Sequence, residues 1–205
     1  MSWKLIQRAK NRLSEERGTI HKEWGAKTTI CLAFPNRYYI GMSNLGFQTL
    51  YHQLNQLRDV VCERAFLPDK EDLPEYRKTD TALFSLESQR PLYDFDILAF
   101  SIPFENDYLN ILTILELGKI PLLRTARNDS HPLVIGGGVA LFLNPEPLSD
   151  FFNAFLIGEG EELLPEFLGC LRQAECEGKT RGECLEEAAA IQGVYIPQFY
   201  EVRYF

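Results

Sequence analysis

Short apolar runs alternate with amphipathic stretches along the chain, and this alternation is the main indication of its fold. The runs that predict buried strands are 28–34, 60–66, 96–102, 132–135 and 154–157. The stretches that predict helices between and after them are 45–58, 107–117, 161–171 and 183–191, and Asp107 is placed to cap the second of these helices. Strands that alternate with helices build right-handed βαβ units. The pattern therefore predicts an α/β fold of three layers, α/β/α, with a mainly parallel sheet, flavodoxin-like or Rossmann-like.

The ends of the chain and one internal segment depart from this alternation. Residues 3–17 place Leu5, Ile6, Ala9 and Leu13 on one helical stripe opposite Lys and Arg. This predicts an N-terminal helix packed on the sheet or on a neighbouring domain, with a membrane-surface helix as the alternative. Residues 68–82 predict a solvated insertion with at most a short helix, 84–87 a short edge strand, and 194–205 a strand pattern that stops at the last residue.

Composition and charge narrow the class of protein. The chain is 45% hydrophobic and 24% charged, lacks an apolar run of the roughly 20 residues that span a bilayer, and has no secretion signal, so we expect it in the cytosol. Its net charge of -8 is uneven. Seven Lys and Arg against three Glu make residues 1–27 basic, whereas residues 28–205 are acidic. An acidic body disfavours nucleic-acid binding by this domain.

The cysteines and histidines do not form a recognisable reactive set. Five cysteines are scattered along the chain, and the last three, at 170, 176 and 184, have neither disulfide-framework nor zinc-knuckle spacing. His21, His52 and His131 stand alone, without a carboxylate or cysteine at ligand spacing. No Ser-His-Asp or Cys-His set can be assembled from loops at one sheet edge. The pattern favours a binding module over a catalyst.

Four loops follow predicted strands, and they should meet at one edge of the sheet because the strands are parallel. Ligands bind at this carboxyl edge in such folds. These loops are 35–44, 101–107, 136–147 and 158–162. Gly136, Gly137 and Gly138 form either a tight strand-to-helix connection or a backbone surface that admits a flat ligand. They do not match G-x-G-x-x-G, so a dinucleotide site is weakly supported.

Acidic and prolyl turns complete this edge. Glu159 and Glu161 open a predicted helix, where carboxylates favour the positive end of the dipole; the alternative is that one of them accepts a hydrogen bond from a ligand. Asn144-Pro-Glu-Pro147 predicts a rigid turn, with Glu146 as a polar contact.

Several short motifs resemble those of a known family. They are residues 33–46 (AFPNRYYIGMSNLG), 84–88 (FSLES), 95–101 (FDILAFS), 135–138 (IGGG), 144–147 (NPEP) and 157–161 (IGEGE). The chain resembles the N-terminal, cobalamin-binding-like domain of radical S-adenosylmethionine proteins (Fe-S oxidoreductases), in the uncharacterised subgroup that fuses it to a radical barrel. The resemblance implies a basic helical extension at 1–27, the cobalamin-binding-like domain at 28–172, and at 173–205 a helix and the start of a linker or strand toward the barrel.

Two departures from the family limit what the resemblance implies. Cobalamin domains with Asp-x-His-x-x-Gly ligate cobalt through histidine, whereas residues 35–41 here read PNRYYIG. Any cobalamin is therefore expected to bind without a histidine ligand. The radical motif Cys-x-x-x-Cys-x-x-Cys is absent, so the four-iron four-sulfur cluster and S-adenosylmethionine are expected only in a further part of the parent protein.

The resemblance implies an accessory role for the chain. It would position a corrinoid or a substrate over the barrel, its partner in the same polypeptide, without being catalytic itself. The expected cofactor-binding residues are Asn36, Arg37, Tyr38, Ser101, Gly136, Gly137, Gly138, Asn144, Glu146 and Glu159. Two alternatives stay open: a degenerate module whose edge is only a domain or subunit interface, and a nucleotide or flavin binder.

Overall fold

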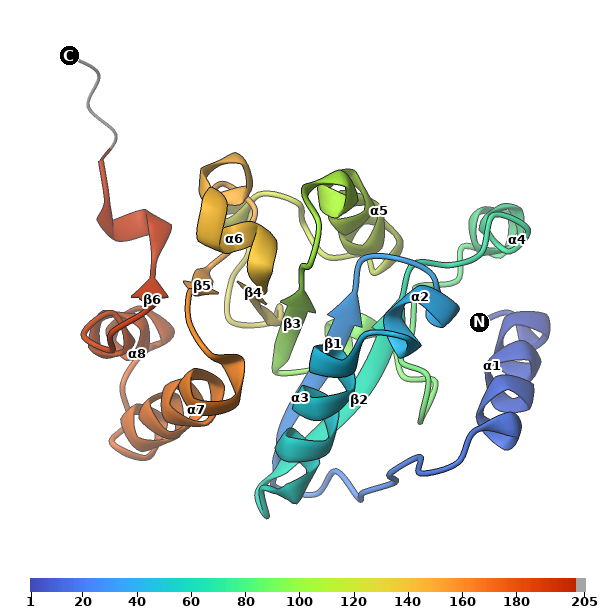
Figure 1. The fold of residues 1–205 in the computed structure, drawn as a ribbon, viewed down its shortest axis with the longest axis horizontal. Helices are drawn as coiled ribbons and strands as arrows, with labels where there is room; N and C mark the ends of the chain where they lie inside the picture. The colour runs from blue at the N-terminus through green and yellow to red at the C-terminus, as the bar shows by residue number, and fades with distance from the viewer. Residues whose placement is uncertain (202–205) are drawn as a thin grey trace.

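The computed structural model describes residues 1–201 and centres on a single mixed sheet (Figure 1). Within these residues the strand order is β2-β1-β3-β4-β5-β6. Neighbours from β2 to β5 pair in parallel, and β6 pairs antiparallel with β5. The strands are β1 (Thr28–Phe34), β2 (Val60–Phe66), β3 (Ile97–Ser101), β4 (Leu133–Gly137), β5 (Ala154–Leu156) and β6 (Val194–Tyr195). The mainly parallel sheet is thus confirmed.

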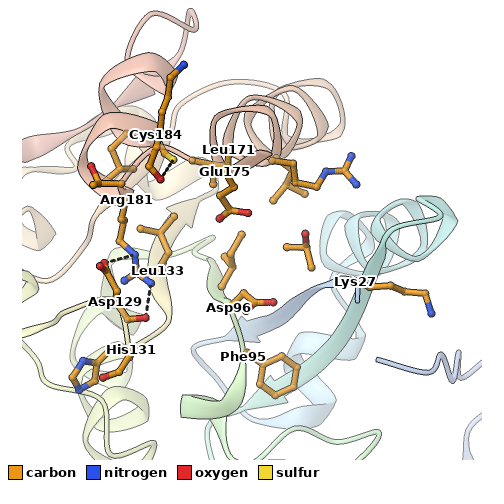
Figure 2. Close-up of a pocket in the computed structure, with 18 of the residues that line it drawn as sticks. Lys27, Phe95, Asp96, Asp129, His131, Leu133, Leu171, Glu175, Arg181 and Cys184 are labelled. Carbon is orange, nitrogen blue, oxygen red and sulfur yellow. Dashed lines mark hydrogen bonds and ion pairs between the residues drawn. The ribbon is translucent and has the colours of Figure 1, made fainter. Parts of the chain in front are cut away.

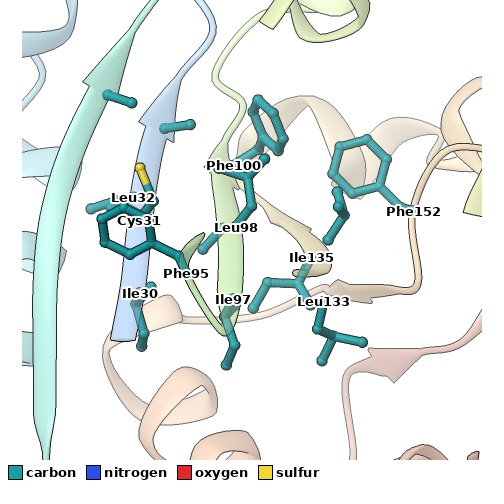
Figure 3. Close-up of a cluster of buried hydrophobic side chains, with 14 of the residues drawn as sticks. Ile30, Cys31, Leu32, Phe95, Ile97, Leu98, Phe100, Leu133, Ile135 and Phe152 are labelled. Atoms are coloured by element: carbon teal, nitrogen blue, oxygen red, sulfur yellow. The ribbon is translucent and has the colours of Figure 1, made fainter. Parts of the chain in front are cut away.

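Continuous apolar sequence explains the central strands. In the register, Ile97 of β3 lies between Ile30 of β1 and Leu133 of β4. Figure 3 shows these side chains in the core with Phe100 and Phe152, and all five are buried. A parallel strand in the middle of a sheet is covered on both faces, so polar alternation is lost. This is why apolar runs, rather than period-two patterns, located the strands.

Helices cover both faces of the sheet. The crossover from β1 to β2 and the crossover from β3 to β4 run in opposite directions along the sheet, so right-handed connections place α3 (Leu45–Gln56) and α5 (Tyr108–Leu117) on opposite faces. Helix α7 (Gly160–Cys176) packs beside α3, and α8 (Arg181–Ala188) packs on α7. The three-layer α/β/α architecture is confirmed.

Short helices occupy segments that the sequence left irregular. They are α2 (Tyr38–Met42) and α6 (Val139–Leu143), each five residues long. Such helices are too short to show a 3.6-residue period, which explains why they were missed. The N-terminal helix and the short helix of the insertion were expected and are α1 (Trp3–Glu15) and α4 (Leu73–Thr79).

The segment after α4 does not form the expected edge strand at 84–87. It has only one isolated bridge, between Phe84 and Pro91. Instead, it covers the outer edge of β2: the Leu86 N–H donates to the Arg64 carbonyl at 2.7 Å, and the Arg64 N–H donates to the Glu87 carboxylate at 2.7 Å. A side chain thus replaces part of a strand ladder, and the edge of β2 is closed to pairing with another chain.

Two buried charges lie in the middle of β2. Arg64 is 2% exposed; its Nε donates to Glu87 at 2.6 Å and its Nη2 to Glu16 at 2.7 Å. Glu63 points to the other face, where Ser85 and Ser88 each donate a hydroxyl hydrogen bond to it at 2.6 Å. Buried charges persist when they are paired and hydrogen-bonded.

The N-terminal 27 residues pack against this region. Glu16 at the end of α1 binds Arg64, and the side chains of Arg8 and Arg12 pair with Asp72 and Asp69. Further along, Lys22 Nζ donates to the Leu57 carbonyl at 2.7 Å at the end of α3, a favourable place for a cation. Three of the seven basic side chains of the extension therefore have partners elsewhere in the fold.

Two details of the sequence interpretation were wrong. Only Val194–Tyr195 of the predicted strand 194–205 is a strand, since Pro197 starts a 3-10 turn; residues 202–205 lie outside the described part. Asp107 does precede α5, but its side chain makes no capping bond, because it binds the side-chain amides of Asn36 and Asn110 instead.

Within residues 1–201, no helix is both long and apolar enough to cross a membrane.

We expect Glu87→Ala to lower the free energy of unfolding by about 3–5 kcal/mol, because it removes a partner of a buried guanidinium. The matched control is Asp80→Asn, which breaks an exposed ion pair with Lys119 at a left-handed position that Asn tolerates, and should change stability by less than about 0.5 kcal/mol. Urea unfolding followed by circular dichroism measures both. A loss below about 1 kcal/mol for Glu87→Ala would contradict the role given to this pair.

Candidate functional site

The carboxyl ends of the parallel strands form the edge where a ligand site is expected. From β1 the chain crosses to β2 at one end of the sheet, whereas from β3 it crosses toward β4 and the other end. The strand order therefore switches direction between β1 and β3. Crevices form at such a switch point, because the connecting loops on its two sides leave in opposite directions. The four predicted loops all follow strands at this edge.

A cavity of about 280 Å³ opens at this edge, and we call it the carboxyl-edge pocket. It lies over the ends of β3, β4 and β5, beside the first turns of α3 and α7. Its walls are mostly apolar, and they include Leu32, Leu50, Ile135, Phe142, Leu156 and Leu164. Its polar lining comes from Asn44, Ser101, Glu159 and Glu161.

A larger cavity of about 660 Å³ lies at the opposite, amino edge (Figure 2). Several of its charged groups already have partners: Arg181 pairs with Asp129, and Asp96 accepts two hydrogen bonds from Thr29. His131 lies here, far from the loops that were expected to bind a ligand. Although this groove is larger, the carboxyl-edge pocket combines mostly apolar walls with a few polar groups at the ends of the strands, so it is the better candidate.

The three consecutive glycines differ in how strongly their surroundings require glycine. Gly138 has φ +122°, and a Cβ there would lie 2.5 Å from the backbone of Ile102. A Cβ on Gly136 would meet the ring of Phe152 at 2.9 Å. Gly137 meets only the Leu156 carbonyl, at an ordinary 3.4 Å. Packing explains the first two, whereas it does not require glycine at Gly137, whose bare backbone forms part of the pocket wall.

The structure brings together half of the expected cofactor-binding residues. Ser101, the three glycines and Glu159 line the carboxyl-edge pocket. The Ser101 hydroxyl and the Glu159 carboxylate have no partner among residues 1–201, so both are available to a ligand. Asn36, Arg37, Tyr38, Asn144 and Glu146 do not line this pocket.

Asn36 holds two loops together. Its Nδ2 donates to Asp107 Oδ1 at 2.8 Å, and Asn110 donates to the same oxygen at 3.1 Å and to the Pro35 carbonyl at 2.9 Å. Burial raises the pKa of the Asp107 carboxyl, while the two amides oppose that rise. Asp107 Oδ2 has no partner among the described residues. Sequence reasoning treated Asp107 as a helix cap and missed this connection between the loops after β1 and β3.

Tyr38 connects α2 to the N-terminal helix. Its hydroxyl donates to Glu16 at 2.5 Å, and the guanidinium of Arg12 lies 4.5 Å from the centre of its ring. Burial, together with Glu16, raises the pKa of this phenol. The side chain of Arg37, in contrast, is half-buried and without a partner within residues 1–201.

Glu146 is engaged by the C-terminal segment. The Tyr195 hydroxyl donates to it, and burial together with this carboxylate raises the pKa of Tyr195 to about 12. The Tyr195 ring stacks on Phe155 at 6.0 Å. The side-chain oxygen of Asn144 accepts from the Glu146 N–H at 3.0 Å, as expected for a rigid turn. The hydrogen bond between Tyr195 and Glu146 therefore connects the loop after β4 to the edge strand β6.

Exposed apolar side chains lie on the segments that follow the strands at this edge, and we call them the apolar rim. They come from the loops after β1, β3 and β4 and are Tyr39, Ile40, Leu45, Phe104, Val139, Phe142 and Leu143. Leu45 is 77% exposed and Leu143 75%. Val139 and Phe142 belong to both the rim and the pocket wall. The sequence signal for the rim was the wholly apolar run Val139–Leu143, which was interpreted as part of a loop.

Metal-ligating side chains do not gather in the described part of the chain. Among residues 1–201, no group of three or more His, Cys, Asp or Glu is placed to hold a metal ion. Cys31 and Cys62 lie on β1 and β2, and the other cysteines lie on α7 and α8. The four loops of the carboxyl edge contain no histidine.

The glycines can be tested separately. Gly138→Ala should lower the free energy of unfolding by more than about 2 kcal/mol, because it adds strain at positive φ and a backbone clash. Gly137→Ala should change it by less than about 1 kcal/mol. Thermal and urea unfolding of the two variants measure the difference. Equal losses would show that Gly137 is also needed for folding.

Comparisons with known proteins show the family of this chain. The family model described as "Radical SAM proteins, N-terminal" matches residues 46–197. An uncharacterized protein of Methanocaldococcus jannaschii, MJ0966, is 23% identical over 132 residues, which are 64% of this chain and 24% of that protein. The chain thus spans about a quarter of that relative's length. No solved structure matches the chain. Because the family model covers most of the sequence, the chain belongs to the radical S-adenosylmethionine proteins, in their N-terminal region.

Proposed function

We propose that this N-terminal domain holds a corrinoid or a substrate in the carboxyl-edge pocket and presents it to the radical S-adenosylmethionine domain. The observation that carries the proposal is the coincidence of the pocket with the apolar rim at the switch point of the sheet. A ligand site and an unpartnered apolar surface at one edge suit a ligand that is shared between two domains.

The rim supports docking through this edge. Its seven large side chains are each more than two-fifths exposed and come from three separate loops. Full burial of such a side chain stabilises by roughly 1.5–3 kcal/mol, so a partner that covers several of them gains substantially. Because Val139 and Phe142 of the rim also line the pocket, docking there would also exclude water from the ligand.

The pocket accommodates only part of a corrinoid. Its volume of about 280 Å³ lies just below the range of roughly 300–1,000 Å³ that is typical of small-molecule sites. A corrin ring would therefore lie outside, against the rim, with one substituent in the pocket beside Ser101 and Gly137. Because these loops lack histidine, cobalt would take no histidine ligand from them. A bound corrinoid would supply the radical chemistry of its cobalt.

The iron–sulfur cluster and S-adenosylmethionine belong, in this proposal, to the radical domain. The described cysteines lie apart on strands and helices, and the thiols of Cys31 and Cys62 have pKa values raised by burial. Buried thiols of this kind are neutral and act as small apolar groups. These residues do not fit a cluster.

A second candidate is an edge that serves only as an interface. It is favoured by Asn36, Tyr38 and Glu146, which make intramolecular hydrogen bonds instead of facing the pocket. Both candidates predict contact through the apolar rim, but only the first predicts a ligand in the carboxyl-edge pocket.

Docking can be measured by hydrogen–deuterium exchange in the polypeptide that contains both domains, compared with this chain alone. We expect amides of α6, Val139–Leu143, to exchange at least about tenfold more slowly when the radical domain is present, since burial of the rim closes them to solvent. Leu143→Asp should remove this protection. The control is Leu123→Asp, an exposed leucine before β4 at the opposite edge, which should keep it.

Equal exchange of α6 in the two proteins would refute docking through the rim. If α6 is protected but neither corrinoid nor substrate binds the two-domain protein, the edge is an interface alone.

A further inference from the structure

We propose that the group held in the carboxyl-edge pocket is a flat ring that is uncharged or positively charged, and that the pocket rejects anionic groups such as phosphate. This inference rests on the proposed function, because it names the kind of ligand group that the same pocket takes. It stands on the shape of the pocket and on the charges around it.

The shape suits a ring. Leucines line the pocket from several sides, Leu50 from α3, Leu164 from α7 and Leu32 from β1. On the β4 side the wall is bare backbone at Gly137, where packing would accept a side chain but none is present. Ring faces pack well against leucine side chains and bare backbone, and about 280 Å³ holds a two-ring system with small substituents.

The charges exclude an anion. Twenty residues line the pocket, and none of them is Lys, Arg or His. The two charged residues are Glu159 and Glu161, both exposed and without an ion-pair partner in the described chain. Carboxylates at the mouth of a pocket with apolar walls repel phosphate and attract cations and N–H donors, because charge is poorly screened beside apolar surface.

The helix ends do not offset this repulsion. Helices α3 and α7 both begin beside the pocket, and free N–H groups at helix starts ordinarily favour anions. In α3, however, Asn44 Oδ1 already accepts from the Phe47 N–H at 2.9 Å. In α7 the first turn carries Glu161 and Glu162, which neutralise the positive end of the dipole.

The consequence separates this site from phosphate-dependent ligands. Nucleotides and flavin mononucleotide are anchored largely by their phosphates in α/β folds, and that anchor is missing here. A ligand that combines a ring with a phosphate would have to leave the phosphate outside the pocket. The nucleotide or flavin alternative is therefore the least favoured by this pocket.

Three compounds with the same ring test the inference. Indole is neutral, tryptamine is positively charged and indole-3-acetate is negatively charged at pH 7. We expect indole and tryptamine to shift the backbone amide NMR signals of Gly136–Gly138 and Gly158–Glu161, and indole-3-acetate to bind at least about tenfold more weakly than tryptamine. The double variant Glu159→Gln, Glu161→Gln should reduce that difference to about threefold or less.

The control is Glu166→Gln, an exposed carboxylate further along α7 that neither lies in its first turn nor lines the pocket, which should leave the difference unchanged. All these substitutions are on the surface, so the variants should fold. The inference is overturned if indole-3-acetate binds as tightly as tryptamine, if the shifts lie outside the pocket, or if no compound binds at about 10 mM.

The result is independent of docking. If the three compounds bind without the expected preference for neutral and positive charge while α6 is still protected in the two-domain protein, this inference alone is refuted. Ring binding without protection of α6 would refute the docking part of the proposed function.

Discussion

Burial of the central strands on both faces is the constraint on which the rest of the structure depends. Strands β1, β3 and β4 consist almost entirely of buried apolar residues, so helices must cover both sides of the sheet. Right-handed crossovers meet this requirement only if the chain reverses its direction across the sheet between β1 and β3. The opening at the carboxyl edge thus follows from core burial, and the loops decide what it binds.

The edge strand β2 shows how the fold handles polar groups that the core cannot avoid. Arg64 and Glu63 are buried on opposite faces of this strand, and one short segment, 85–88, supplies partners to both. Glu16, which binds Arg64 and Tyr38, carries the same network into α1 and α2. The position of α2, which carries part of the apolar rim, therefore depends on charges buried at the edge of the sheet, and a defect there would reach the functional edge.

Sequence reasoning succeeded where one local property determines the outcome. Apolar runs located the five parallel strands, and the loops that follow them were correctly assigned to one edge. It did not foresee partners that are distant in sequence: Asn36 and Tyr38 were expected to contact a ligand, and the structure shows them bound to Asp107 and Glu16. Nothing near Asn36 in the sequence indicates Asp107, because the contact exists only after β1 and β3 pair. The short helix α6 was missed because five residues carry no period.

The glycines at the end of β4 show how little of this edge is free to specify a ligand. Gly138 is held by the backbone of Ile102 and Gly136 by the ring of Phe152, so any protein with this packing needs glycine at both positions. Only Gly137 is free of such a demand, and it faces a pocket whose charged groups are the two glutamates at the start of α7. In the proposed site, the groups free to set specificity are therefore the bare backbone at Gly137, the Ser101 hydroxyl and the two carboxylates. Changes at these four positions would alter the site without any change in the core of the fold.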